Sequence, residues 1–164
     1  MAATKNSEKK PKLLIGRREI VDFPELDLHG IDAKIDTGAW SCAIHCHHIH
    51  PVTIDGVEKV HFNLLDPSHA DYDEKEFVLP IYQLKTVRSS SGHSEDRYFI
   101  QTILRIFDEN LTVILSLTDR SDMKYPVLIG RKLLQKRFVV DVSRTNLSAR
   151  GKIIRCELKR SSSK

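Results

Sequence analysis

The residues with the clearest capacity for chemistry are Asp36, Thr37 and Gly38, which follow the short alternating run "IDAKI" at 31–35. Asp and Gly pack poorly on a pleated surface, so the triplet is expected where a strand ends. An ordinary turn would account for these residue types. A hydrolytic carboxylate site would account for all three. It needs a fixed carboxylate, a hydroxyl that ties two loops together, and a residue without a side chain that lets two backbones approach.

This chemistry requires a pair of carboxylates. Two carboxylates held close together share one proton, because both cannot carry a negative charge at that distance. One acts as a base on a water molecule, and the other donates a proton to the carbonyl group that the water attacks. The chain has a single Asp-Thr-Gly triplet, and an enzyme with both halves on one chain would need about twice this length. The second Asp36 would therefore come from a second copy across a two-fold axis, which predicts a homodimer.

A second segment, "PVLIGRKLL" at 126–134, lies far downstream of Asp36. It reads as an apolar strand, then Gly130 and Arg131, then an amphipathic helical turn. This combination resembles the retropepsins, single-lobe proteases of retroviral type, and more closely a bacterial branch labelled "ATP-dependent zinc protease". The resemblance covers about residues 14–142 and is also carried by Ile15–Glu19, Pro24–Leu26, Ser41, Ala43, His45 and Ser89–Ser94.

The resemblance implies a mainly β fold, a closed retropepsin-like barrel with one short helix. It also implies that Asp36 is the catalytic aspartate. The residues implied to support the active-site loop are Thr37 and Gly38, Ala39 beside the substrate groove, and Gly130 and Arg131, which pack the helix end nearby. Viral retropepsins usually carry an acidic residue after Asp-Thr-Gly-Ala that pairs with the Arg, and this chain has Trp40 there. The partner of Arg131 is therefore a question for the structure.

A flap is also implied by the resemblance, over residues 88–98. Its tip would consist of Ser89, Ser90, Ser91, Gly92 and His93. Because residues 88–96 of this segment include no apolar anchor, we expect them to be mobile without ligand.

By resemblance, the chain is a homodimeric aspartic endopeptidase that cleaves a peptide or protein and uses no cofactor. The bacterial branch often occurs beside a ligase that adds glutamates to a ribosomal protein. A link to such a ligase, and a glutamate-rich tail as substrate, are therefore implied. Two alternatives stay open: a catalytically silent dimer of the same fold that binds peptides, and a zinc-dependent hydrolase.

The sequence lacks the motifs that the branch's label would require. It contains neither H-E-x-x-H nor a G-x-x-x-x-G-K-[ST] phosphate loop. The run "HCHHIH" at 45–50 is rich in potential ligands, but alternate residues of a strand point to opposite faces, so no more than two or three could converge. We therefore predict no metal site.

Short segments with β-branched and apolar residues must position these groups, and they predict a small β barrel or sandwich. The expected strands are 13–21, 31–36, 42–49, 57–65, 76–87, 97–107, 110–118, 126–130, 138–142 and 152–158. The expected helix is "RKLLQKR" at 131–137, and the "DEN" turn at 108–110 predicts a hairpin.

Composition narrows the class of protein. The 164 residues, 40% hydrophobic and 29% charged, suit one globular domain, which we place at 13–158 between basic disordered tails at 1–12 and 159–164. No apolar run approaches the roughly 20 residues of a membrane span, no secretory signal is evident, and three cysteines do not make a disulfide framework. These features predict a cytoplasmic protein. The net charge of +4 resides in the ends, so nucleic-acid binding is not expected.

Overall fold

Strands dominate the part of the chain that the computed structural model describes, residues 10–151 and 153–156. The strands are β1 (Lys12–Phe23), β2 (Leu28–Ile35), β3 (Cys42–Ile54), β4 (Val57–Leu64), β5 (Glu76–Pro80), β6 (Gln83–Arg88), β7 (Ser94–Ile106), β8 (Glu109–Thr118), β9 (Val127–Ile129), β10 (Phe138–Thr145) and β11 (Arg155–Cys156). The helical elements are a 3-10 turn, η1 (Pro24–Leu26), and one short helix, α1 (Arg131–Leu134). Within these residues, no helix has the length and apolar character needed to cross a bilayer.

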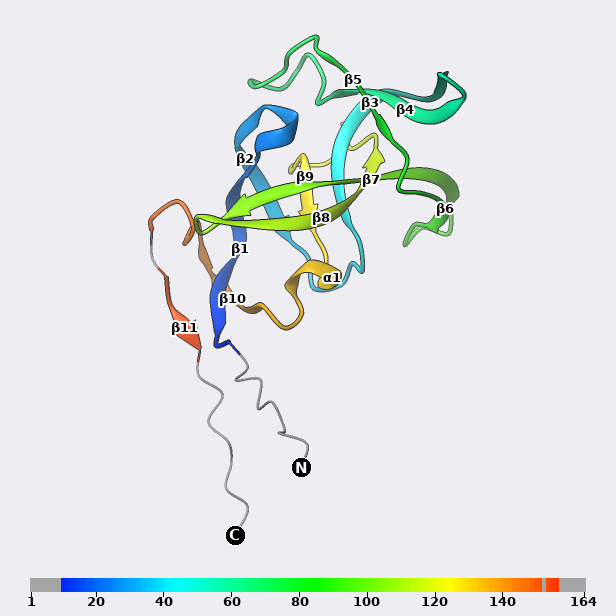
Figure 1. Cartoon of the computed structure of the whole chain (residues 1–164). Coiled ribbons are helices and arrows are strands. Elements are labelled where there is room, and N and C mark those ends of the chain that lie inside the picture. Colours follow the sequence, from blue (N-terminus) through cyan, green and yellow to red (C-terminus); the bar gives the residue numbers. More distant parts are fainter. Residues whose placement is uncertain (1–9, 152, 157–164) are drawn as a thin grey trace, which may run out of the picture.

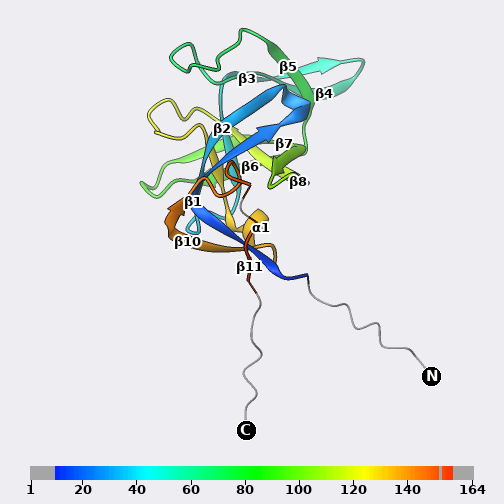
Figure 2. The same ribbon diagram turned by 90° about the vertical axis from the view of Figure 1, so that its left-hand side faces the viewer.

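Six of the strands close into a barrel in the order β1-β2-β9-β3-β8-β7, and β7 returns to β1 where Asp22 pairs with Arg105 (Figure 1). β10 and β11 extend the sheet beside the first half of β1, and β6 extends it beside β7. β4 and β5 continue from the far half of β3, at the opposite end of the barrel from β10 and β11 in both views (Figure 2). The structure confirms the predicted mainly β fold, a closed barrel with one short helix.

The alternation in β2 shows how the core positions the residues of interest. Ile31, Ala33 and Ile35 are buried in the barrel, whereas Lys34 between them is exposed. Each fully buried Ile-sized side chain contributes roughly 1.5–3 kcal/mol, and a slip of one residue would turn every one of them outward. The register of β2 is therefore strongly specified, and Lys34 and Asp36 lie on the same outward face.

A buried carboxylate joins the two ends of the domain. Glu19 is fully buried, and its oxygens accept hydrogen bonds from the backbone N–H groups of Gly16 (2.8 Å), Leu147 (3.3 Å) and Ser148 (2.9 Å). Gly16 also permits a close approach, because a Cβ there would lie 2.5 Å from the carbonyl oxygen of Arg144. Glu19 thus ties β1 to the turn that follows β10.

Two predicted boundaries were wrong for physical reasons. The expected strand at 76–87 is two strands, because β5 pairs with β4 whereas β6 pairs with β7. The predicted hairpin of β7 and β8 is present, but its turn is Phe107–Asp108 and not 108–110. Both turn residues have positive φ angles, 51° and 60°, as a two-residue hairpin with matching twist requires.

The C-terminal predictions also need adjustment. The helix expected over 131–137 ends at Leu134, and Gln135 follows with an extended ψ of 141°. Of the strand expected at 152–158, residues 155 and 156 are a strand, and residues 152, 157 and 158 lie outside the described residues. The predicted tails at 1–12 and 159–164 lie outside them too, apart from residues 10–12, the last of which begins β1.

Candidate active site

Asp36 lies directly after β2, and neighbouring backbone groups fix its carboxylate. Its own N–H donates to the carbonyl of Ile129 in β9 (2.9 Å). Its Oδ1 accepts hydrogen bonds from the N–H groups of Gly38 (2.9 Å) and Ala39 (3.2 Å). Its Oδ2 lies 3.4 Å from Nζ of Lys34, and the side chain keeps 24% of its surface exposed. One oxygen is therefore held by the loop, and the carboxylate as a whole still faces solvent.

The loop that carries Asp36 rests on the start of α1. The N–H of Arg131 donates to the carbonyl of Ala39 (2.8 Å), and that of Lys132 donates to the carbonyl of Trp40 (3.0 Å). A Cβ on Gly130 would lie 2.5 Å from the carbonyl oxygen of Ser41, so only glycine allows this approach without movement. The structure thus brings the two motifs of the sequence together across one interface.

Arg131 contacts the loop through its side chain as well. Its guanidinium donates to the carbonyl of Thr37 (2.9 Å) and lies 5.8 Å from the centre of the half-exposed Trp40 ring. These contacts take the place of the acidic partner that viral retropepsins supply. Thr37 and Gly38 are themselves exposed at the tip of the loop, where a second copy could reach them.

The segment expected to form the flap is the tip of the β6–β7 hairpin. Ser89 donates its N–H to the carbonyl of His93 (2.8 Å), and Gly92 donates to the carbonyl of Ser89 (3.0 Å). Gly92 has a φ of 87°, which suits glycine at such a turn, and a Cβ there would meet open space. The tip is therefore a closed turn. Its mobility, and its closure over Asp36, stay predictions.

Two cations near Asp36 escaped the sequence reasoning. Arg120, in the loop between β8 and β9, is partly buried. Its pKa is lowered by burial and by the neighbouring Arg97 of β7, whereas the negative charge of Asp36 acts to raise it. Lys34 and Arg120 thus place positive charge near the carboxylate. Only Lys34 could have been found from the sequence, because it stands two positions before Asp36 on an alternating strand.

A family model described as "Retropepsin-like aspartic endopeptidase RimB" matches residues 14–151. The chain belongs to the RimB-like family. This match confirms the resemblance to the retropepsin-like bacterial branch, and it includes the Asp36 loop, the hairpin tip and α1.

Curated relatives of the RimB-like chain carry a different name. A "Probable alpha-L-glutamate ligase" of Shewanella pealeana is 32% identical over 136 residues, which are 80% of this chain and 29% of the relative. Proteins with the same name from Desulfotalea psychrophila and Parasynechococcus marenigrum are each 31% identical over 134 residues, 79% of this chain and 28% of the relative. The chain therefore spans less than a third of the relatives it matches.

A solved structure supports the fold. A Legionella pneumophila protein of unknown function superposes with a TM-score of 0.64 at 21% identity, over 82% of this chain and 97% of that protein. At this identity the likeness concerns the barrel alone.

The histidine-rich run of the RimB-like chain does not converge on one point. His45 is buried, whereas the rings of His47 and His48 lie side by side with their centres 4.4 Å apart, and His50 faces His61 across the β3–β4 pair at the same distance. Across residues 10–151 and 153–156, no three His, Cys, Asp or Glu side chains are grouped so as to hold a metal ion.

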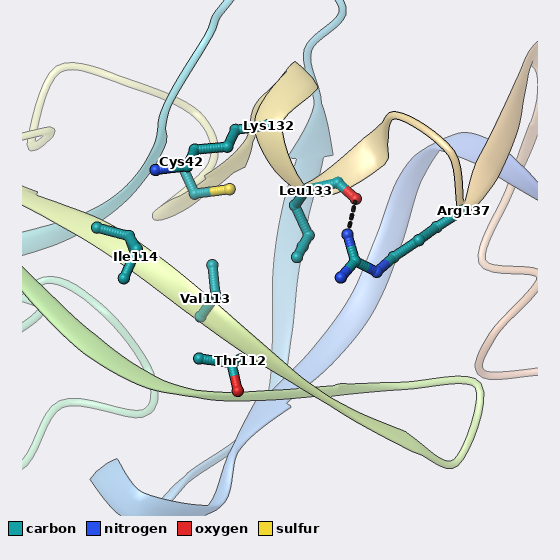
Figure 3. Close-up of a pocket in the computed structure, with 7 residues that line it drawn as sticks. All are labelled: Cys42, Thr112, Val113, Ile114, Lys132, Leu133 and Arg137. Carbon is teal, nitrogen blue, oxygen red and sulfur yellow. Dashed lines mark hydrogen bonds between the residues drawn. The ribbon is translucent and has the colours of Figure 1, made fainter.

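A cavity of about 180 Å³ is lined in part by α1, and Asp36 is not among its lining residues. Its lining residues are Cys42, Thr112, Val113, Ile114, Lys132, Leu133 and Arg137 (Figure 3). Burial raises the pKa of the Cys42 thiol to about 11, although the N–H of Gly130 and the charge of Lys132 act in the opposite direction. Cys42 is therefore a protonated wall residue at neutral pH and not a nucleophile.

Proposed function

We propose that the chain is an aspartic-type endopeptidase whose catalytic pair consists of Asp36 from two copies of the chain. The observation that carries the proposal is the Asp36 loop itself. One oxygen of the carboxylate is fixed by the backbone of Gly38 and Ala39, and the exposed tip at Thr37 and Gly38 leaves room for the same loop of a second copy. Membership of a family described as aspartic endopeptidases supports it.

The proposed reaction needs one ionised and one protonated Asp36. The ionised carboxylate takes a proton from a water molecule, whose oxygen attacks the carbonyl carbon of the scissile bond. The protonated carboxyl gives its proton to the carbonyl oxygen, which forms a tetrahedral diol. The diol then collapses and the carbon–nitrogen bond breaks. The carboxyl that took a proton from water gives it to the leaving nitrogen, and a diol hydroxyl gives its proton to the other carboxylate, so the pair again holds one proton.

We further propose that the substrate is a peptide rich in glutamate. Lys34 lies 3.4 Å from Asp36, and the charge of Arg120 also interacts with that of Asp36. This positive charge favours carboxylate side chains near the cleaved bond. In the relatives, a segment similar to this chain forms part of a longer protein named as a glutamate ligase. A glutamate tail added to a ribosomal protein would suit both observations.

One observation favours a second candidate, a silent dimer that binds acidic peptides without cleaving them. Nζ of Lys34 lies 3.4 Å from Oδ2 of Asp36, the carboxylate oxygen that the loop backbone leaves free. If this ion pair persists in the dimer, Lys34 would occupy the oxygen that has to contact the attacking water, and only binding would remain.

The deciding experiment is cleavage of a fluorogenic peptide of several glutamates by the wild-type chain and by Asp36→Asn. A matched control is Asp32→Asn, since Asp32 lies on the same strand and pairs with Arg18 on the surface. Cleavage by wild type and Asp32→Asn, but not by Asp36→Asn, would support the endopeptidase. Tight binding without cleavage would favour the silent dimer, and loss of cleavage in EDTA with recovery in zinc would favour a zinc hydrolase.

A further inference from the structure

His45 is a buried titratable side chain that the proposed reaction does not use. It lies in β3 with 3% of its surface exposed, and both ring nitrogens have partners. Nε2 lies 2.6 Å from Oδ2 of Asp66, and Nδ1 lies 2.7 Å from the backbone nitrogen of Arg120. A buried imidazole bonded at both ends has a fixed orientation.

The contact with Arg120 determines where the ring proton is. A backbone N–H can only donate, so Nδ1 of His45 must accept and carries no proton. The proton of the neutral ring is then on Nε2, where it is donated to Asp66. Asp66 suits this role, because hydrogen bonds from Ser68 and from His45 lower the pKa of its carboxyl to about 2 and keep it ionised.

The loop that His45 holds leads directly to Asp36. Residues 119–126 join β8 to β9, and the N–H of His45 also donates to the carbonyl of Pro126 at the end of this loop (2.8 Å). Nε of Arg120 bonds the carbonyl of Tyr125 (3.4 Å), which closes the loop on itself. One end of the loop thus carries Arg120, whose charge interacts with that of Asp36. The other end continues into β9, where the carbonyl of Ile129 accepts a hydrogen bond from the Asp36 backbone.

We propose that His45 is a positioning residue: its neutral ring, oriented by Asp66, anchors the 119–126 loop and so holds Arg120 where its charge can act on Asp36 and on a substrate carboxylate. The proposal rests on the proposed function for the role of Arg120. It also predicts a proton-controlled release. A proton on Nδ1 would face the N–H of Arg120, so the two donors would repel and the anchor would be lost.

The groups around the ring specify what happens next. Oδ1 of Asp119 lies 3.6 Å from Nδ1 and is the acceptor that a protonated ring would turn to. Asp66, on the other side of the ring, keeps its bond to Nε2. Two charged residues of β7 are near the ends of the same loop: Glu95 accepts a hydrogen bond from Thr118, and the charge of Arg97 acts on Arg120. Protonation would therefore exchange the Arg120 backbone for the Asp119 side chain within the same loop, and the backbone of Arg120 would lose its anchor.

The first test needs no enzymatic activity. A long-range proton–nitrogen NMR spectrum of the full chain at neutral pH should show His45 with Nδ1 unprotonated and Nε2 protonated. As the pH falls, amide shifts of residues 119–125 should follow the titration of the His45 ring. In His45→Asn these shifts should be absent, because the Asn carbonyl takes the position of Nδ1 and accepts from Arg120 at any pH. A proton on Nδ1 at neutral pH would overturn the proposal.

The second test compares peptides of glutamate and of glutamine. His45→Leu should raise KM for the glutamate peptide about tenfold, the effect of losing one hydrogen bond to a charged group, as Arg120→Gln should. It should change kcat for the glutamine peptide little, and His45→Asn should restore KM. His29→Leu, at an exposed histidine, is the matched control. If His45→Leu does not fold, Asp66→Ala serves instead. It removes the carboxylate that orients the His45 ring, so KM for the glutamate peptide should rise as well.

Equal losses on both peptides in His45→Leu, without rescue by His45→Asn, would overturn the positioning role. If the wild-type chain cleaves neither peptide, the proposed function fails, and the NMR experiment still decides the role of His45.

Discussion

The Asp36 loop and the β6–β7 hairpin tip are both exposed turns, but their hydrogen bonds come from different places. The Asp36 loop holds its carboxylate with its own N–H groups, and the loop as a whole is bonded to β9 and to the start of α1, segments far away in the sequence. The tip at 89–93 bonds only within itself among the described residues, from Ser89 to His93 and from Gly92 to Ser89. A loop tied to distant elements keeps its geometry without ligand, whereas a self-contained turn can move as a unit without breaking other bonds.

The largest effect on activity should come from a substitution in the Asp36 loop. Asp36→Asn keeps the shape of the side chain but removes its ability to share a proton, so peptide cleavage should fall by at least about a thousandfold. Circular dichroism should show an unchanged fold. Mixing wild type with an excess of Asp36→Asn chains should also suppress cleavage through mixed dimers, and full activity in such mixtures would contradict a shared pair.

Two glycine substitutions should lower the free energy of unfolding by different amounts, one beside the Asp36 loop and one at the hairpin tip. In Gly130→Ala the new methyl would meet the carbonyl of Ser41 at 2.5 Å, so the free energy of unfolding should fall by about 2–3 kcal/mol. In Gly92→Ala the methyl meets open space, and only the positive φ costs about 1 kcal/mol. Urea unfolding measures both. A larger loss for Gly92→Ala would mean that the tip, and not the loop, is the constrained region.

Hydrogen exchange should show the same contrast in dynamics. The amides of residues 89–93 should exchange within the shortest labelling time in the free protein, whereas those of Asp36 and Arg131 should be protected by their bonds to Ile129 and Ala39. A non-cleavable statine-type peptide should slow exchange at the tip. The control is Ser90→Ala, which changes a side chain of the turn but leaves both of its backbone hydrogen bonds in place, so exchange at the tip should not change. Protection of the tip without ligand would refute its assignment as a mobile flap.

The smallest effect concerns the pH dependence of the free energy of unfolding at Asp66, the carboxylate that orients His45. The pKa of Asp66 is lowered to about 2 by Ser68 and then His45, so this carboxylate stabilises the fold above its unfolded pKa. That contribution declines as the pH falls below about 4 and is lost as it passes through the folded pKa. The stability difference between wild type and Asp66→Asn should therefore be constant near neutrality and shrink in acid, as urea unfolding at several pH values would show. An unchanged difference at pH 2 would contradict the shift.

The parts of the site that the sequence predicts are those written as short contiguous motifs. The Asp36 triplet and Gly130–Arg131 each combine a strand end with residue types of special geometry, and the family resemblance suggested that they meet. Arg120 and the His45–Asp66 pair were not foreseeable, because they meet through the order of strands around the barrel. Strand ends were least predictable where one apolar run serves two partners, as at residues 76–87.

Glu19 has a consequence for the order in which the protein is made. Two of the three N–H groups that its carboxylate accepts belong to Leu147 and Ser148, near the end of the described chain. While synthesis is under way those donors do not yet exist, and burying the carboxylate with a single donor would cost free energy. We therefore expect β1 to reach its final place only after residues 147 and 148 are available, so the barrel that carries the active-site loop would be completed late in synthesis.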